Sequence, residues 1–206
     1  MESLKNIPTF EELRKITKVK SIFFDMDGTL VNTEPLHARA LQETLKQLSS
    51  SKKFTKEELL KRYHGLADHF VYADLKVYIN ASLPNFLEIK NSIFLKLLDE
   101  SEILIDDRIM ELLRDLKSNG YQLALITASE KVPALMLLKK EGIEKFFDLI
   151  LTRDDCQRTK PDPLPYLEAL RLLDITKEEA FIFEDSEAGI QAAKNSGIPF
   201  KAVNWF

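Results

Sequence analysis

Two aspartates at the end of an apolar segment are the first residues in this chain whose types and spacing could do chemistry. The segment "SIFF" is followed by Asp25 and Asp27, and Gly28 comes directly after them. Carboxylates at the end of a buried strand repel one another and resist desolvation, so their placement requires an explanation. Three explanations are open at this point: a turn, a calcium-binding loop, or a catalytic site built around a cation.

The other apolar segments are also followed by polar side chains. "YQLALI" precedes hydroxyl residues, "AFIF" precedes two acids, and the loop after "FDLILT" carries a lysine before Pro161. In an open parallel sheet, ligands bind beyond the carboxyl ends of the strands. We therefore expect one edge of the sheet to gather, with the two aspartates, the residues Thr127, Ala128, Ser129, Lys160, Glu184 and Asp185.

This set of side chains predicts phosphoryl transfer. Carboxylates gathered this closely repel by several kcal/mol at intermediate dielectric, and a hard divalent cation offsets that repulsion. Mg²⁺ takes one or two carboxylates plus a substrate phosphate. Lys160 supplies a second positive charge, while Thr127 and the backbone N–H groups after it can hold phosphate oxygens. A carboxylate aimed at phosphorus is then a competent nucleophile, which gives an aspartyl-phosphate intermediate.

The hydrophobic pattern predicts the elements that must position these residues. The four segments "SIFF", "YQLALI", "FDLILT" and "AFIF" are typical of buried strands, and "FKAV" near the end could form a fifth. Between the later strands lie helical patterns at residues 106–119, 131–141, 164–173 and 186–195. Alternating strands and helices with short connections predict an α/β fold with a doubly wound parallel (Rossmann-like) sheet.

The first predicted strand is followed by a long helical insertion. Roughly 70 residues separate it from the next strand, far more than one crossover helix needs. Helical patterns fill this interval at residues 35–48, 56–63, 68–79 and 84–99. We expect residues 1–33 and 101–206 to form the α/β core and residues 34–100 a helical cap domain, with hinges near its two ends. Residues 1–19 are expected to form an extension with one short helix.

Composition favours a globular protein with a small-molecule partner. The chain has 206 residues, 45% of them hydrophobic and 30% charged, and a net charge of −4. An acidic chain without a basic, aromatic-rich segment argues against nucleic acid as a partner. No segment has the length of a membrane span or of a signal-peptide core. The single cysteine allows no intrachain disulfide. We expect a cytoplasmic monomer.

The motifs resemble those of a known enzyme family. "DMDGTL", "ITAS", "KPDP" and "FEDSEAG" are similar, in this order, to the four motifs of the haloacid dehalogenase-like hydrolases. They span most of the chain, from Asp25 to Gly189. The insertion resembles the α-helical cap of the branch that contains β-phosphoglucomutase and many small-metabolite phosphatases. The resemblance implies a Mg²⁺-dependent enzyme that acts on a small phosphorylated metabolite.

The resemblance also implies a role for each matching residue. Asp25 would be the nucleophile and a Mg²⁺ ligand. Asp27 would protonate the leaving group and then activate water, while its backbone carbonyl would reach the metal. Asp185 would bind Mg²⁺, and Glu184 would be either a further ligand or an anchor for bound water.

Other matching residues would bind the substrate. Thr127 would hydrogen-bond the phosphoryl oxygens, together with the turn formed by Ala128 and Ser129. Lys160 would neutralise charge on the nucleophile and the phosphate. In the insertion, His37 follows the first hinge, where relatives often carry a histidine. Gly65 lies in the position of the substrate-specificity loop, so we expect both residues at the substrate.

The calcium-loop explanation fails on its first ligand position. When the chain is placed in EF-hand register, Phe23 occupies that position, and the preceding segment has the pattern of a strand rather than a helix. Simple turn and helix-cap roles would have to coincide at four separate motifs. The calcium loop is therefore rejected, and the catalytic interpretation is favoured.

Three functions remain within the family resemblance. β-Phosphoglucomutase-like proteins usually carry an arginine three residues after the cap-loop glycine, whereas this chain has Asp68 there. That departure favours a phosphomonoesterase. A sugar phosphomutase is the first alternative. A non-catalytic relative that binds a phosphorylated ligand or a partner protein is the second.

Overall fold

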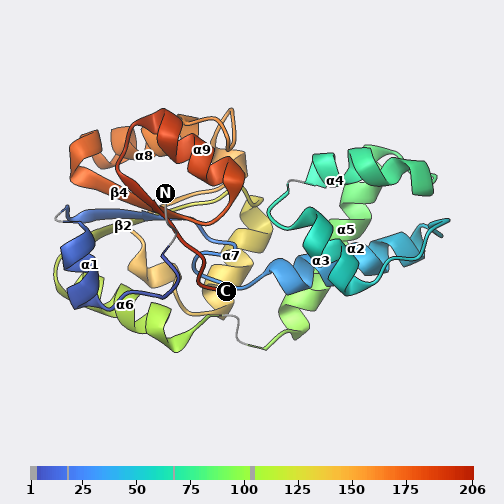
Figure 1. Ribbon diagram of the computed structural model, residues 1–206, viewed down its shortest axis with the longest axis horizontal. Coiled ribbons are helices and arrows are strands. Elements are labelled where there is room, and N and C mark those ends of the chain that lie inside the picture. The colour runs from blue at the N-terminus through green and yellow to red at the C-terminus, as the bar shows by residue number, and fades with distance from the viewer. Residues whose placement is uncertain (1–3, 18, 67, 103–104) are drawn as a thin grey trace. The chain divides into compact units, whose positions relative to one another are not determined.

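The structure is a computed structural model that describes residues 4–17, 19–66, 68–102 and 105–206. The chain divides into two compact units, one comprising Met1–Asn32 with Ile103–Phe206 and the other Thr33–Glu102. Figure 1 shows a sheet covered by helices in the first unit and helices alone in the second. Each unit has its own apolar core.

A parallel sheet forms the centre of the first unit. Within the described ranges it has five strands in the order β3-β2-β1-β4-β5. These strands are β1 (Ser21–Phe24), β2 (Gln122–Ile126), β3 (Leu149–Leu151), β4 (Ala180–Glu184) and β5 (Phe200–Ala202). Phe24 of the central strand aligns with Leu125 on one side and Phe183 on the other. All four residues of β1 are buried, as a strand covered on both faces requires.

Helices cover both faces of this sheet, which confirms the predicted doubly wound fold. In Figure 1, α8 and α9 lie over one face, and α1 and α6 lie over the other. Their bounds, with those of α7 and the 3₁₀ turns, are α1 (Phe10–Ile16), α6 (Asp107–Ser118), α7 (Lys131–Lys140), η2 (Glu144–Phe146), η3 (Arg153–Asp155), α8 (Leu164–Leu173), η4 (Lys177–Glu179) and α9 (Glu187–Ser196).

The core between the sheet and α8/α9 fixes the position of the strand ends. Phe23 and Ile182 of the sheet are fully buried against Ala169 of α8 and Ala192 of α9. Burying a side chain such as Phe23 contributes about 1.5–3 kcal/mol. Because these contacts begin one or two residues before the polar strand ends, the core holds those ends in register.

The second unit is built from helices. They are α2 (Glu34–Gln47), α3 (Lys56–Tyr63), α4 (Asp68–Leu75), the 3₁₀ turn η1 (Lys76–Tyr78) and α5 (Leu83–Glu100). Leu41, Leu59 and Phe86 lie in their shared apolar core. The helix expected over residues 68–79 ends earlier, at Leu75, and tightens into η1. The Tyr72 hydroxyl donates to the carbonyl of Ala81 at 2.8 Å and ties the chain back after that turn.

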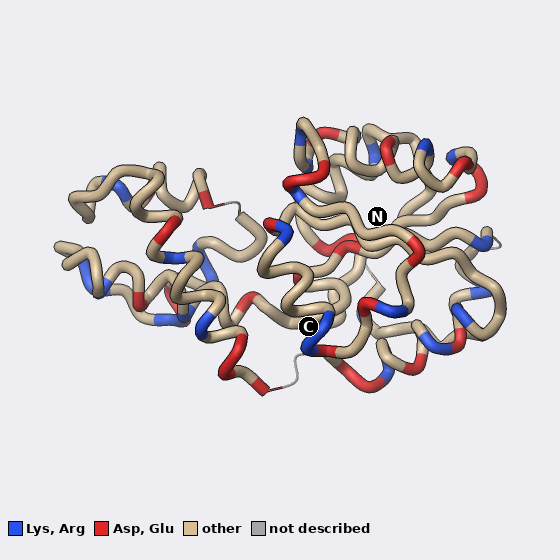
Figure 2. The backbone as a smooth tube through the Cα atoms, turned by 180° about the vertical axis from the view of Figure 1, so that it is seen from behind, with Lys and Arg blue, Asp and Glu red and all other residues tan. Residues whose placement is uncertain are grey.

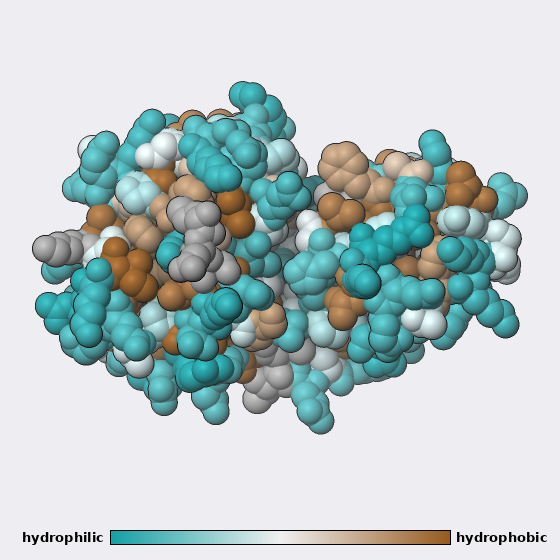
Figure 3. All heavy atoms as spheres, viewed as in Figure 1, coloured by the Kyte–Doolittle hydropathy of each residue, from teal (hydrophilic) through white to brown (hydrophobic). Residues whose placement is uncertain are grey.

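Charges of both signs are distributed over both units. Figure 2 shows Lys and Arg interspersed with Asp and Glu along the helices. The face shown in Figure 3 is mostly hydrophilic, with separate apolar patches. In the part of the chain that the structure describes, every helix is too short or too polar to cross a membrane.

Candidate active site

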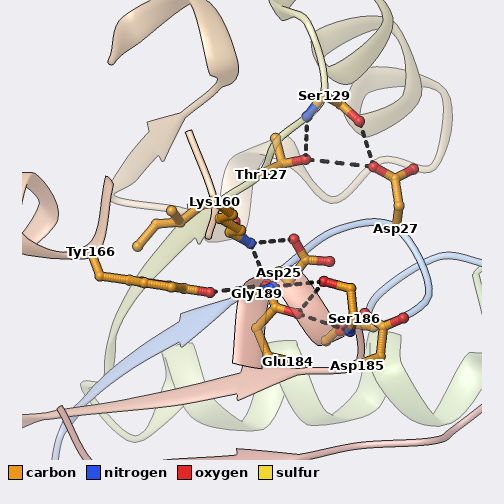
Figure 4. Close-up of polar contacts among 12 residues, drawn as sticks. Asp25, Asp27, Thr127, Ser129, Lys160, Tyr166, Glu184, Asp185, Ser186 and Gly189 are labelled. Carbon is orange, nitrogen blue, oxygen red and sulfur yellow. Dashed lines mark hydrogen bonds and ion pairs between the residues drawn. The ribbon is translucent and has the colours of Figure 1, made fainter. Parts of the chain in front are cut away.

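A buried lysine connects three of the strand ends. The Lys160 ammonium donates to Asp25 Oδ1 at 2.6 Å, to Glu184 Oε1 at 2.5 Å and to the carbonyl of Ile126 at 2.7 Å (Figure 4). Asp25 follows β1, Ile126 ends β2 and Glu184 ends β4. Lys160 is only 7% exposed. All three ammonium protons therefore have acceptors, and the lysine cross-links the carboxyl ends of neighbouring strands.

Glu184 is held by hydrogen bonds on both of its oxygens. In addition to Lys160, Oε1 accepts from the Tyr166 hydroxyl at 3.1 Å. Oε2 accepts from both the backbone N–H and the hydroxyl of Ser186, each at 3.1 Å. The side chain is fully buried. A buried carboxylate is tolerated only when it is paired and hydrogen-bonded in this way.

Two glycines make room for the acids of β4. A Cβ on Gly189 would lie 1.7 Å from Glu184 Oε1, and a Cβ on Gly28 would lie 2.2 Å from Asp185 Oδ2. Gly28 also has φ of +81°, a conformation that side chains rarely adopt. The hydroxyl of Thr29 then donates to Asp185 Oδ1 at 2.9 Å. The first motif thus positions an acid of the fourth.

The acids at these strand ends fit a hard divalent cation. Ligand oxygens of Asp25, Glu184 and Asp185 lie within 4.8 Å of one another, and the Lys160 ammonium pairs with two of them, Asp25 and Glu184. Burial and then the charge of Glu184 raise the pKa of Asp25 well above its usual range, against the opposing effect of Lys160. The same two causes raise the pKa of Asp185 to about 7. Such an excess of buried negative charge is what Mg²⁺ would relieve.

Asp27 is directed away from this cluster. Its Oδ2 accepts from the Ser129 hydroxyl at 2.6 Å and lies 3.5 Å from the Thr127 hydroxyl, at the end of β2. The Ser129 N–H donates to Thr127 Oγ1 at 3.0 Å and closes the turn. Figure 4 shows Asp25 beside Lys160 and Asp27 beside Ser129. Two aspartates only two residues apart therefore have different surroundings, which suits different chemical roles.

Most of the predicted site residues lie together in the first unit. Asp25, Asp27, Thr127, Ser129, Lys160, Glu184 and Asp185 are joined by the contacts above, and Ala128 is exposed in the same turn. His37 and Gly65 belong to the second unit. There the His37 ring stacks on Phe94 with a centroid distance of 4.2 Å, and the Gly65 N–H donates to Glu34 Oε1 at 3.1 Å.

Two residues of the site were not expected. Tyr166 occupies one apolar position among others on α8, and its sequence context gives no sign that its hydroxyl binds Glu184. Gly189 belongs to the motif "FEDSEAG", but only the close approach of Glu184 explains why a side chain is excluded there.

Comparisons with known proteins identify the family of this chain. The family model described as "Haloacid dehalogenase-like hydrolase" matches residues 22–203. A phosphorylated carbohydrates phosphatase of Thermotoga maritima is 35% identical over 87% of this chain and 82% of its own length. The pyrophosphatase PpaX of Bacillus cereus is 28% identical over 91% of this chain and 84% of its own.

A solved structure shows the same architecture. CbbY from Rhodobacter sphaeroides, crystallised in complex with phosphate, superimposes with a TM-score of 0.74 and 32% identity, covering 88% of this chain and 84% of CbbY. With motifs, fold and relatives in agreement, the chain belongs to the haloacid dehalogenase-like hydrolases and is an enzyme of the phosphatase class.

Proposed function

We propose that this protein is a Mg²⁺-dependent phosphomonoesterase that hydrolyses a small phosphorylated metabolite through an aspartyl-phosphate on Asp25. The observation that carries the proposal is the separation of the two aspartates: Asp25 is bound to Lys160 and Asp27 is bound to Ser129. A nucleophile needs to be held in place for attack, and a proton donor needs surroundings that differ from those of the nucleophile.

In the first step, an Asp25 carboxylate oxygen attacks phosphorus as the bond from phosphorus to the ester oxygen breaks. Asp27 gives its proton to that oxygen, and the alcohol leaves. In the second step, Asp27 takes a proton from water, the water oxygen attacks phosphorus, and Asp25 is released with inorganic phosphate. Lys160 opposes the rise in the pKa of Asp25 and offsets charge on the phosphoryl group, to which Thr127 donates a hydrogen bond.

The metal would be held by Asp25 and Asp185, with the Asp27 carbonyl, and Glu184 would support it directly or through water. When bound, Mg²⁺ would neutralise negative charge at the transferred phosphoryl group. The sequence-based expectations of a monomer and of a cytoplasmic location are part of the proposal.

We further propose that residues 34–100 form a cap that selects the substrate, with His37 and Gly65 at the substrate and hinges near residues 32–35 and 100–107. Residues 103–104 of the second hinge lie outside the described residues. Asp68, where mutase-like relatives carry an arginine, accepts a hydrogen bond from the buried Lys90. An acid already paired with a lysine gives no cation for a second phosphate. This favours a phosphomonoesterase over a mutase.

Mg²⁺-dependent hydrolysis of p-nitrophenyl phosphate, with and without EDTA, tests the proposal. Asp25→Asn should lower kcat by at least about 10³-fold because it removes the nucleophile. Asp115→Asn, the same change at an exposed position of α6 in the first unit, is the matched control and should keep wild-type activity. Full activity of Asp25→Asn, or no turnover of any phosphoester by the wild-type protein, would refute it. A panel of sugar phosphates and pyrophosphate would then identify the substrate class.

A further inference from the structure

The turn that follows β2 is attached to the loop that follows β3. The Thr127 N–H donates to the carbonyl of Leu151 at 2.9 Å, and two residues later along each segment the Arg153 N–H donates to the carbonyl of Ser129 at 2.9 Å. The guanidinium of Arg153 also lies 3.3 Å from Glu130 Oε1. The turn with the candidate phosphate-binding residues is therefore supported by a segment about 25 residues away in the sequence.

The segment after β3, residues 152–155 (the β3 loop), also caps helix α7. Glu130 stands at the N-cap position of α7, but its side chain makes no capping hydrogen bond. Instead, Asp154 Oδ2 accepts from the Lys131 N–H at 2.9 Å. A carboxylate at this end of a helix satisfies an otherwise unpaired N–H and complements the helix dipole. The cap thus comes from the β3 loop rather than from the helix's own sequence.

The loop is itself held in one conformation. Asp155 Oδ2 accepts from the Thr152 N–H at 3.0 Å and from the Thr152 hydroxyl at 2.6 Å, and Asp155 Oδ1 accepts from the Lys131 ammonium at 2.9 Å. Thr152 is 2% exposed and directly follows β3. Asp154 is therefore presented to Lys131 from a supported loop.

These contacts lead to Asp27. Ser129 lies between Thr127 and the start of α7, and its hydroxyl donates to Asp27 Oδ2 at 2.6 Å. The Ser129 carbonyl is held by Arg153, and the helix that begins two residues later is held by Asp154. Movement of the β3 loop would displace the Ser129 hydroxyl from Asp27.

We propose that Asp154 is a positioning residue for the proton transfer, because by capping α7 from the β3 loop it holds the Ser129 hydroxyl against Asp27. This inference rests on the proposed function, in which Asp27 protonates the leaving oxygen. A purely structural role for the loop would lower the activity on all substrates alike. A positioning role predicts that the loss of activity is larger for a substrate whose leaving group needs a proton.

Two substrates distinguish a positioning role of Asp154 from a purely structural one. An alkyl phosphate such as glycerol 1-phosphate must take the Asp27 proton as its ester bond breaks, whereas p-nitrophenolate can leave without one. We expect Asp154→Ala to lower kcat/KM for the alkyl phosphate by about tenfold, a part of the 10²–10⁴-fold that a positioned acid supplies. For p-nitrophenyl phosphate the loss of kcat/KM should be less than about twofold. The parameter compared is kcat/KM because it covers the steps up to release of the leaving group and leaves out the later proton transfer from water, which is the same for both substrates.

Three further variants sharpen the test. Asp154→Asn keeps an acceptor oxygen and should retain most of the alkyl-phosphate activity. Ser129→Ala should lower kcat/KM more for the alkyl phosphate than for p-nitrophenyl phosphate, and adding Asp154→Ala to it should change the ratio of the two values little further. Thr9→Ala removes the side chain that caps α1 at Glu12 and is the matched control for losing a helix cap; it should leave the ratio of the two activities unchanged.

The outcomes distinguish the inference from the proposed function. Equal losses on both substrates in Asp154→Ala, or no loss on the alkyl phosphate, would overturn the positioning role while the phosphatase proposal stands. A wild-type protein that hydrolyses neither substrate with Mg²⁺ would overturn both. If circular dichroism shows that Asp154→Ala is poorly folded, Ser129→Ala and the double variant Ser129→Ala/Asp154→Asn are compared instead. The quantity compared is the ratio of alkyl-phosphate activity to p-nitrophenyl phosphate activity. A further fall in this ratio of more than about threefold in the double variant would contradict the inference.

Discussion

Each unit of this protein contains a buried lysine paired with acid, and the two pairs differ in a way that separates function from structure. Lys160 is 7% exposed and donates to two carboxylates in a cluster where acids outnumber the ammonium. Lys90 of α5 is 4% exposed and donates to one carboxylate, that of Asp68. The first arrangement retains negative charge that a cation can bind. The second is neutral as a pair, which is what a helical core tolerates.

The largest expected effect is at Lys160. Lys160→Met keeps the length of the side chain but leaves Asp25 and Glu184 facing each other without a cation. We expect kcat for p-nitrophenyl phosphate to fall by about 10³-fold, because the charge on the nucleophile and the phosphoryl group is no longer offset. Steady-state kinetics at saturating Mg²⁺ measures this. Activity within tenfold of wild type would show that Lys160 is no more than a structural cross-link.

The equivalent change at Lys90 should act on stability instead. Lys90→Met leaves Asp68 without its cation and should lower the free energy of unfolding by about 3–5 kcal/mol, as expected when one partner of a buried pair is removed. Adding Asp68→Leu should restore most of that loss, because an apolar pair can replace a buried ion pair. Urea unfolding measures both. If Lys90→Met/Asp68→Leu remains as unstable as Lys90→Met alone, the Lys90–Asp68 pair is not simply a structural pair that apolar side chains can replace.

Gly189 tests whether the position of Glu184 matters for the reaction. In Gly189→Ala the new Cβ would collide with Glu184 Oε1, so the carboxylate and its bond to Lys160 must shift. We expect kcat to fall by about 10²-fold, since a displacement near 1 Å in a catalytic site has that effect. Gly120→Ala is the control: its φ is +75° and its Cβ would meet open space. It should cost about 1–2 kcal/mol of stability and leave kcat unchanged.

The response to pH and Mg²⁺ should also distinguish the charged cluster from the neutral pair. The pKa of Asp185 is raised by burial and by Glu184 from 3.8 to about 7 in the folded protein. The folded state therefore binds this proton more tightly than the unfolded state does, so the contribution of Asp185 to the stability of the metal-free protein falls as pH rises from about 4 to about 7 and no further above that.

Mg²⁺ should reverse this loss at pH above about 7, where Asp185 is ionised and can bind it. Urea midpoints with EDTA and with Mg²⁺ across this range measure the effect, and Asp185→Asn should reduce it strongly. A Mg²⁺ stabilisation that is equally large at pH 5 and pH 8 would contradict the assignment of Asp185 as a ligand.

Features set by residues close together in the sequence could be predicted, whereas features set by contacts between distant segments could not. The strands and the acids at their ends could be predicted because apolar runs and the residues after them are local in sequence, and a parallel sheet brings all its carboxyl ends to one edge. The roles of Gly189, Tyr166 and Asp154 depend on how segments far apart in the chain approach each other. The end of α4 at Leu75 likewise had no Gly or Pro to mark it.

The smallest expected effect compares two tyrosines, one in each unit. The Tyr166 hydroxyl donates to Glu184 at 3.1 Å, and the Tyr63 hydroxyl donates to Asp74 at 2.5 Å. Burial and then Glu184 raise the pKa of Tyr166, and burial and then the hydrogen bond to Asp74 raise that of Tyr63, so both phenols remain protonated donors. Each pair can therefore be tested by removing one hydroxyl.

Tyr166→Phe removes a donor from a fully buried carboxylate and should cost about 1–3 kcal/mol of stability, with a decrease in kcat of about threefold to tenfold because the Glu184 carboxylate is then held less firmly in place. Tyr63→Phe removes a donor from Asp74, whose side chain is 43% exposed and also paired with Arg62. It should cost about 0.5 kcal/mol and leave kcat unchanged, since water replaces the lost hydrogen bond. Parallel urea unfolding and kinetics measure both variants. If Tyr63→Phe lowers kcat as much as Tyr166→Phe does, the hydroxyl of Tyr166 has no special connection to the site, and Glu184 is positioned by Lys160 and Ser186 alone.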